Sequence, residues 1–362
     1  MELERSVAFA KPVNLSTLDS RKKNPITVRA TSGIETMLAK SGYKDLEYRG
    51  QLTLDFSPTI QNVAKKYDKV PVAIGQFQQG KDIISAGVLA DSQLLKWGAE
   101  SMRVIEFYYL CKEGKIGKYD EQARTAYITM KEIFALTGKT EPKQRQRYRK
   151  KFLEDLLVAA MPTWYITVNG APAGADKFLK WDYIPKGDII SMRLADHIQN
   201  LFLSSQRFSD TRKLLLTDNL DYAIAQHLES RYTINHNNET NANNIISVKS
   251  LLEIADNHLP SKEKAAKHLM KLRGQPIIDA LNAAMKVGTL TSWTFCGPKK
   301  EPYTQEQIDK CFRNYSDFEK AYILFESAMG ATDDFRTWRN NMIEKHQRHL
   351  EIQEKKKRKG KK

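Results

Sequence analysis

The strongest chemical signal in the sequence is a short basic segment. Six of the nine residues from 143 to 151 are lysine or arginine, and two glutamines are interleaved with them. Arginine recognises guanine, and glutamine recognises adenine, through paired hydrogen bonds to the base edge. Lysine contacts fix a protein on the phosphate backbone. The candidates for base or phosphate contact are Gln144, Arg145, Gln146, Arg147 and Arg149, and the candidates for backbone contact are Lys143, Lys150 and Lys151.

The basic segment belongs to a helix that changes character along its length. Pro142 suits the first helical turn, and Pro162 ends the helix. The apolar residues that can be buried come directly after the basic ones, between 152 and 158. A recognition helix needs this division, because its N-terminal residues meet the groove while its C-terminal part packs on the domain. A solvated helix face is the alternative interpretation of the same basic run.

The elements around this helix follow a recognisable order. A helix over 92–114 is followed by a short strand (126–130), a short helix ending at Gly138, the basic helix and an alternating hairpin over 164–184. This order is typical of the winged variant of helix-turn-helix. The hairpin is the predicted wing, in which Lys177 and Lys180 would contact phosphates.

A similar order recurs later in the chain. Residues 217–232 read as a helix, 246–255 as a strand and short helix, 258–274 and 276–288 as helices, and 289–295 as a strand. In the second copy, Lys264, Lys267 and Lys271 share one helical face. Here a solvated face is about as good an explanation as nucleic-acid contact. Residues 303–330 read as helical.

We therefore predict an α+β, mostly helical chain with tandem winged helix-turn-helix domains and a basic C-terminal tail. The predicted divisions are an N-terminal region of uncertain fold (1–90), a first winged-helix domain (91–205), a second (206–300), and C-terminal helices with a lysine-rich tail (301–362).

Composition favours a polyanionic partner and excludes several classes. The 362 residues hold 58 lysine or arginine against 43 aspartate or glutamate, a formal net charge of +15. No apolar run is long enough to cross a membrane, and the N-terminus lacks the apolar stretch of a secretory signal. The three cysteines are widely spaced, which favours a reducing cytoplasm over a disulfide framework.

Enzymatic signatures are missing from the sequence. It has no GxxxxGK[ST] phosphate loop, no GxGxxG and no GxSxG, and its closest histidines are His346 and His349. We predict no catalytic residue, no cofactor and no metal site. A catalytic site assembled from distant residues would leave no such signature.

The tandem arrangement resembles the replication initiators of theta-replicating plasmids and some phages. The resemblance covers roughly 91–300 and rests on ITMKEIFALTGKTEP, KQRQRYRKKFLEDLL, the hairpin WYITVNG…KFLKWDYI and the second copy ISVKSLLEIA…PIIDALNAAM. It implies binding of double-stranded DNA at origin repeats, recruitment of host replication factors, homodimer formation, and no activity of its own as an enzyme. The N-terminal region of uncertain fold (1–90) and the long lysine-rich end depart from the family's pattern.

Three other hypotheses stay open on the sequence alone. A winged-helix transcription regulator would read DNA in the same way as an initiator. A nuclease, primase or nicking initiator would cleave DNA with a metal or form a covalent adduct. A non-specific RNA-binding or structural nucleoprotein would bind unrelated sequences equally, with a steep dependence on salt.

Deletion of residues 355–362 tests the role of the tail. The segment carries seven positive charges, and its removal lowers the net charge to +8. We expect weaker binding to all nucleic-acid sequences alike, because phosphate contacts carry no sequence information. Competition binding with a specific and a random duplex measures this, and a loss confined to the specific duplex would contradict it.

Overall fold

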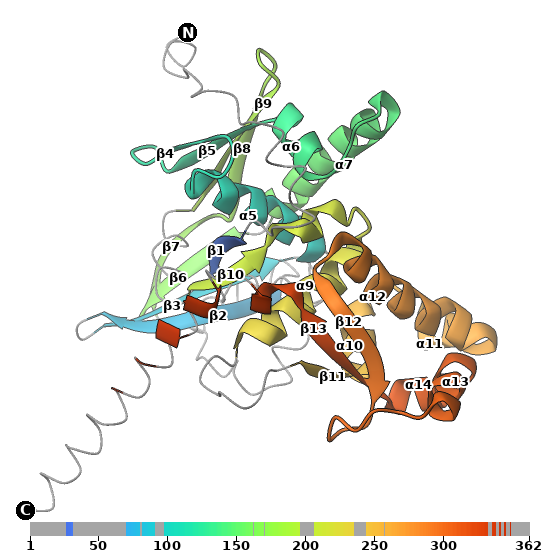
Figure 1. The fold of residues 1–362 in the computed structure, drawn as a ribbon. Coiled ribbons are helices and arrows are strands. Elements are labelled where there is room, and N and C mark those ends of the chain that lie inside the picture. The colour runs from blue at the N-terminus through green and yellow to red at the C-terminus, as the bar shows by residue number, and fades with distance from the viewer. Residues whose placement is uncertain are drawn as a thin grey trace, which may run out of the picture.

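The computed structural model describes residues 27–31, 70–79, 82–90, 98–161, 163–169, 171–195, 206–234, 244–256 and 258–331, with a few positions between 335 and 348. Within these ranges helices and antiparallel sheets alternate (Figure 1), which fits the predicted α+β class. The lysine-rich tail, the predicted start of the first helix before Gly98, and most of residues 1–69 lie outside the described residues.

The first unit is built around the basic helix. Its sheet has the order β4-β5-β9-β8, and all its strand pairs are antiparallel. The elements in chain order are α5 (Gly98–Lys112), β4 (Lys118–Asp120), β5 (Thr125–Thr129), α6 (Met130–Leu136), α7 (Pro142–Ala160), β8 (Leu179–Ile184) and β9 (Ile189–Leu194).

Local sequence signals set the helix-turn-helix. Thr129 caps α6 in a capping box with Glu132, so strand β5 passes directly into the helix. Gly138 follows α6 with a φ of 68°, a left-handed conformation that glycine adopts without steric cost. Pro142 stands in the first turn of α7, as the sequence predicted.

The predicted wing over 164–184 is wrong in its pairing. Residues Thr163–Val168 form β6, which pairs with β7 (Ala171–Lys177) and with β3 (Asp82–Ala90). The second half of the predicted hairpin is β8, and its partner is β9. Strand β9 lies between β5 and β8, and side chains on both of its faces are buried, so it lacks the alternation that marks a half-exposed strand.

Strand β6 therefore belongs to a separate sheet, to which the chain contributes β2 (Val70–Gln79) and β3 before α5, and β6 and β7 between α7 and β8. This sheet has the order β2-β3-β6-β7. A further pair joins β1 (Thr27–Thr31) to β10 (Gln206–Asp210). Residues from the N-terminal region, whose fold the sequence does not indicate, therefore pair with a strand from the middle of the chain.

The second unit repeats the topology of the first. Its sheet has the order β11-β13-β12, which matches β5-β9-β8, because in each sheet the last strand along the chain lies in the middle. The two units thus share a strand order, in which β8, and not β6, corresponds to β12. The elements are α9 (Asn219–Ile234), β11 (Ile245–Ser247), α10 (Val248–Ala255), α11 (Lys262–Ala265), η5 (Ala266–His268), η6 (Met270–Gly274), α12 (Gln275–Val287), β12 (Leu290–Cys296) and β13 (Tyr322–Ser327).

Strand β13 corrects the helical prediction for 303–330. The structure has two helices there, α13 (Gln305–Arg313) and α14 (Tyr315–Lys320), followed by the strand and a short turn η7 (Ala328–Ala331). Burial in β13 mostly alternates from one residue to the next, the period of a strand. The segment is short and apolar, a case in which periodicity alone separates helix from strand poorly.

The two units share a hydrophobic core. One cluster of buried side chains runs from α5, α6 and α7 through α9 to α10, α12 and α14. Between α5 and α7 the rings of Phe107 and Phe152 meet edge to face, with centroids 5.1 Å apart. The linker connecting the units, β10 followed by η4 (Thr211–Leu215), is itself buried from Ser209 to Leu214.

Alanine substitutions at two glycines after α5 test how the turn into β4 is built. Gly114 and Gly117 both have positive φ, but only at Gly117 would a Cβ overlap the backbone carbonyl oxygen of Tyr127. We expect Gly114→Ala to cost about 1 kcal/mol of unfolding free energy through backbone strain, and Gly117→Ala to cost about 1–3 kcal/mol more through overpacking. Denaturant unfolding measures both, and equal costs would show that the close approach at Gly117 relaxes freely.

Candidate nucleic-acid interface

Helix α7 is exposed in its first two turns, and in the rest only one face is buried. Residues 141–147 are exposed, whereas Tyr148, Phe152 and Leu156 are buried against the first unit. Burial begins at Tyr148, within the basic run, and the partly buried Arg149 and Lys151 that follow are paired, because a long cation stays in water unless it is paired. The predicted division of this helix is therefore present.

Four predicted contact residues point their polar groups to solvent. Lys143, Gln144, Gln146 and Arg147 are exposed, and within the described part of the chain their side chains make no hydrogen bond or ion pair. Arg145 is also exposed, but its Nε donates to the carbonyl oxygen of Lys139 at 3.1 Å. Arg145 thus closes the turn between α6 and α7.

Arg149 is engaged within the protein. Its guanidinium forms a two-pronged ion pair with Asp188 and donates to the hydroxyl of Tyr183 at 3.2 Å. Because Tyr183 lies on β8 and Asp188 just before β9, the side chain ties the helix to the β8–β9 hairpin. Burial opposes the charge of Arg149, but these partners raise its pKa, so the arginine stays cationic.

The remaining two cations of the basic segment also have partners. Lys150 lies 4.0 Å from Glu154 on the helix surface, an exposed pair of the kind that contributes little. Lys151 is half-buried and donates to Asn219 at 2.9 Å, with Asp155 at 3.4 Å.

The β8–β9 hairpin takes the place of the predicted wing. Lys180 lies on β8 and is exposed, whereas Lys177 lies at the end of β7 and donates to the carbonyl oxygen of Met161 at 3.0 Å. Sequence reasoning missed Lys186, which is exposed at the tip of the hairpin. The signal that marks it is the Pro185–Lys186–Gly187 turn between two apolar runs.

The second unit presents a matching helical run over residues 262–287. It joins α11, η5, η6 and α12 in one continuous run, which the sequence suggested as two helices. Lys264, Lys267 and Lys271 are exposed in its first half and make no ion pair within the described residues. The second half, from Ile277 to Ala284, is mostly buried.

A buried arginine closes the turn before this run. Arg273 donates to the carbonyl oxygen of Pro260 and, at 2.7 Å, to Asp256. At the N-terminal end, Lys262 pairs with Glu319 of α14 at 2.5 Å. The turn and the start of the run are thereby held against the rest of the second unit.

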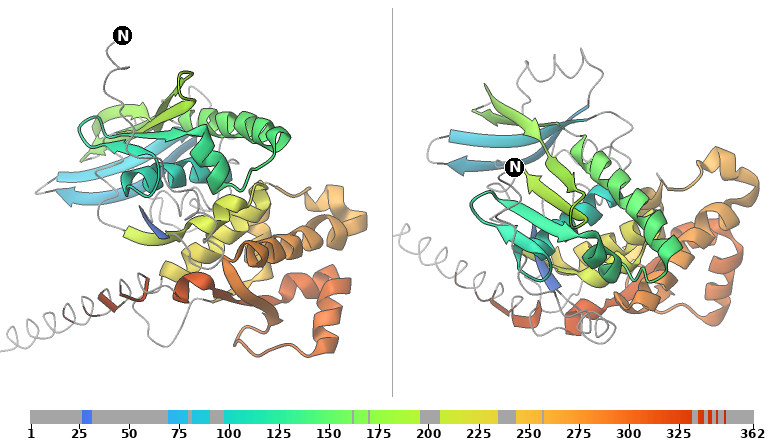
Figure 2. Two further views of the ribbon diagram at one scale, coloured as in Figure 1. Left: turned by 45° about the horizontal axis from the view of Figure 1, so that its top comes forward. Right: turned by 90° about the horizontal axis from the view of Figure 1, so that it is seen from above.

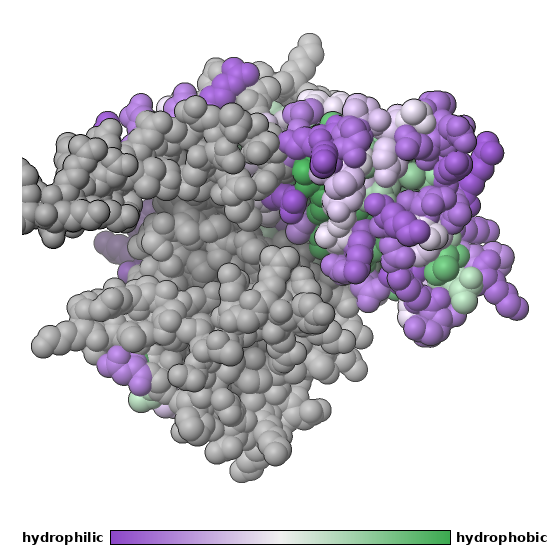
Figure 3. All heavy atoms as spheres, turned by 90° about the horizontal axis from the view of Figure 1, so that it is seen from below, coloured by the Kyte–Doolittle hydropathy of each residue, from purple (hydrophilic) through white to green (hydrophobic). Residues whose placement is uncertain are grey.

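The two basic helix halves lie on the same side of the molecule. In both views of Figure 2, α7 and the orange helix that begins the second run extend to the right-hand side. Figure 3 shows the described surface over the second unit, which is mostly hydrophilic with small apolar patches.

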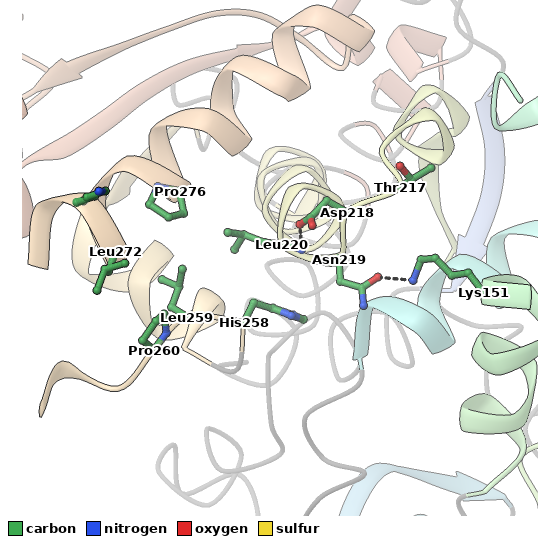
Figure 4. A pocket seen from close by; sticks show the side chains of 11 residues that line it. Lys151, Thr217, Asp218, Asn219, Leu220, His258, Leu259, Pro260, Leu272 and Pro276 are labelled. Atoms are coloured by element: carbon green, nitrogen blue, oxygen red, sulfur yellow. Dashed lines mark hydrogen bonds between the residues drawn. The ribbon is translucent and has the colours of Figure 1, made fainter. Parts of the chain in front are cut away.

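A hollow of about 580 Å³ lies between the two units at this side (Figure 4). Lys151 and Asn219 form its rim on the first unit's side, and Leu272 and Pro276 line the opposite wall. His258 points into it, and burial lowers the pKa of this imidazole. A ligand that touches both helices would pass over this hollow.

Two other kinds of site were sought in the described residues. No cluster of three or more histidine, cysteine, aspartate or glutamate side chains there could hold a metal ion. None of the helices in the described ranges is long and apolar enough to cross a membrane.

Comparison with known proteins finds similar chains among solved structures. No family model matches the chain, and no curated protein matches it. Among solved structures, the crystal structure of Pi initiator protein in complex with iteron DNA is similar, with a TM-score of 0.41 and 13% sequence identity over 65% of this chain and 93% of that chain. That structure holds an initiator protein bound to iteron DNA.

Two neighbouring arginines of α7 should behave differently when truncated. We expect Arg149→Ala to lower the unfolding free energy by up to about 1 kcal/mol, because it breaks a half-exposed ion pair. We expect Arg147→Ala to change it by less than about 0.5 kcal/mol, because the side chain is exposed. Chemical denaturation of the two variants measures this, and an equal loss would show that Arg149 does not hold the hairpin.

Proposed function

We propose that the chain is a tandem winged-helix protein that binds double-stranded DNA in a sequence-specific manner. One observation carries the proposal. Two units of the same strand order each present a long helical run that is basic and exposed in its first half and apolar and buried in its second. One such helix would be an ordinary solvated surface, whereas two on one side of the molecule fit one extended polyanion.

The geometry supports major-groove reading by α7. The N-terminal residues of a recognition helix meet base edges, and these are the residues of α7 whose polar groups reach solvent. Arg147, Gln144 and Gln146 are the proposed base contacts, and Lys143 and Lys150 the proposed phosphate contacts. The β8–β9 hairpin, with Lys180 and Lys186, is the proposed wing.

Arg145, Arg149 and Lys151 have a second part in this proposal. Each of them donates hydrogen bonds within the protein: Arg145 to the turn before α7, Arg149 to the β8–β9 hairpin and Lys151 to α9. Their charges still add to the field that attracts DNA, but their donors are less free to read bases.

We further propose that the DNA-binding activity serves replication initiation at origin repeats, with host replication factors recruited by the bound protein. The support for this proposal is the resemblance in architecture between the two units and the replication initiators. The same resemblance leads us to propose that the protein forms a homodimer and has no catalytic activity. A transcription regulator would bind DNA through the same helices, so the location of the bound site separates the two.

Selection of duplexes from a random DNA pool at physiological salt, with excess competitor, tests the proposal. We expect enrichment of one site, and a plasmid carrying repeats of that site should replicate only when the protein is supplied. Enrichment without such replication would favour a regulator. Tight binding without enrichment would overturn sequence-specific recognition.

Substitutions on α7 separate base reading from phosphate contact. On the selected duplex, we expect Arg147→Ala to cost about 1–3 kcal/mol of binding free energy and to relax the preference at one base position. Lys143→Ala should instead weaken all duplexes alike and reduce the salt slope by about 1.

Lys115→Ala is the matched control for both substitutions. Lys115 is exposed in the loop between α5 and β4, outside α7 and the β8–β9 hairpin, and its loss changes the net charge by the same amount. If Arg147→Ala weakens specific and random duplexes equally, Arg147 does not read a base.

A further inference from the structure

The two units are joined through a buried lysine in the linker between them. The side chain of Lys213 is 1% exposed, and its ammonium lies 3.0 Å from Glu106 of α5 and 2.8 Å from Glu229 of α9. Helix α5 begins the first unit and α9 begins the second. One cation therefore contacts a carboxylate from each unit.

The other polar groups of this cluster also bridge the two helices. The hydroxyl of Ser209 contacts Glu106 at 3.1 Å and Glu229 at 3.0 Å. Tyr222 of α9 donates its hydroxyl to Glu106 at 2.8 Å. Burial raises the pKa of the Glu106 carboxyl, an effect that Lys213 opposes and Glu229 reinforces. The cluster is connected from one unit to the other without an exposed member.

A second polar cluster ties α7 itself to the second unit. Arg103 of α5 is fully buried, donates to Asp155 of α7 at 2.9 Å, and donates to Asn219, the first residue of α9, at 3.1 Å. Lys151 of α7 donates to the same Asn219 oxygen at 2.9 Å. Through Asn219, the first turn of α9 thus contacts both α5 and α7.

These contacts constrain the geometry more than an apolar interface would. Apolar surfaces attract without direction, so they tolerate small slides and rotations. A buried charge that loses its partner is strongly unfavourable, so the network holds only one mutual arrangement of α5, α7 and α9. Helix α7 and the run 262–287 inherit that arrangement, because each is packed on one of these helices.

We propose that the buried network around Lys213 and Arg103 fixes the distance between the two basic helix halves and thereby sets the spacing of the DNA half-sites read together. The spacing part rests on the proposed function. Two linked binding modules gain affinity only when the linkage lets both engage at once. A rigid junction therefore selects one half-site spacing, whereas a hinge would accept several.

The distance itself can be measured without DNA. Spin labels at Gln146→Cys on α7 and Lys267→Cys on the second run report it, since the three native cysteines are buried. We expect one narrow distance distribution for the full-length protein. A broad distribution would overturn the proposal.

Two network variants and one control complete this measurement. The triple variant Lys213→Met, Glu106→Gln, Glu229→Gln removes the charges at nearly constant volume, and Asn219→Ala removes the contact of α9 with Arg103 and Lys151. Asn282→Ala is the control, because Asn282 accepts a hydrogen bond from Trp293 within the second unit only. Both network variants should broaden the distribution and the control should not.

If the triple variant does not fold, Asn219→Ala still tests whether the network fixes the distance between the two labels. Asn219 is half-buried at the first turn of α9, where a small residue is tolerated. An unchanged distribution in folded Asn219→Ala would overturn the role of the Arg103 cluster, and an unchanged one in the folded triple variant would overturn that of the Lys213 cluster.

Binding to spaced duplexes tests the functional half. Insertion of 5 base pairs between the selected half-sites turns one by about half a helical turn. We expect the wild-type protein to lose about 100-fold in affinity, since only one unit then engages. The network variants should lose less than about tenfold and bind an isolated half-site like the wild type.

The outcomes separate the two proposals. Equal spacing penalties in wild type and variants would overturn the spacing role while leaving sequence-specific binding intact. If selection enriches no duplex, the proposed function is wrong, and the label distances still decide whether the network fixes the two helices.

Discussion

A fully buried arginine is the constraint on which the arrangement of the first unit depends. Arg103 keeps its charge, so its place in the core requires an anionic partner. Asp155 supplies the charge, Asn219 accepts a second hydrogen bond, and the ring of Tyr222 lies 4.8 Å below the guanidinium. These partners come from α7 and α9, so meeting the needs of one side chain sets how three helices cross.

The basic half of α7 is a consequence of that crossing. Asp155 anchors the C-terminal half of the helix in the core, and Tyr148 is the first residue of α7 to be buried. The two turns before Tyr148 therefore extend beyond the core, where lysine and arginine are the residues that water favours. The second unit reaches the same form through different contacts, with Arg273 closing the turn and a π-helical segment at Gly274 packing on Phe318.

Local signals predicted the elements, and distant pairings escaped prediction. Thr129, Gly138 and Pro142 mark element ends within a few residues, so α6 and α7 were placed correctly. Strand β9 carries no alternation, because side chains on both of its faces are buried, and β6 pairs with a strand about eighty residues earlier. The partners of Lys213 and Arg103 lie as far as 116 residues away along the chain. A local sequence pattern cannot predict a contact between residues so far apart.

The number of basic residues in the candidate site is larger than the number whose hydrogen-bond donors are free to contact bases. Of the six cations in 143–151, Arg145, Arg149 and Lys151 bond to the protein's own turn, hairpin and neighbouring helix. Net charge draws a polyanion from a distance, but it acts on any sequence. Discrimination needs donors held in one position, and a donor is held only when its neighbours are bonded in place. The engaged cations fix the helix and the turn that carry Arg147 and the two glutamines, so in the proposed function they would make base reading by these residues specific.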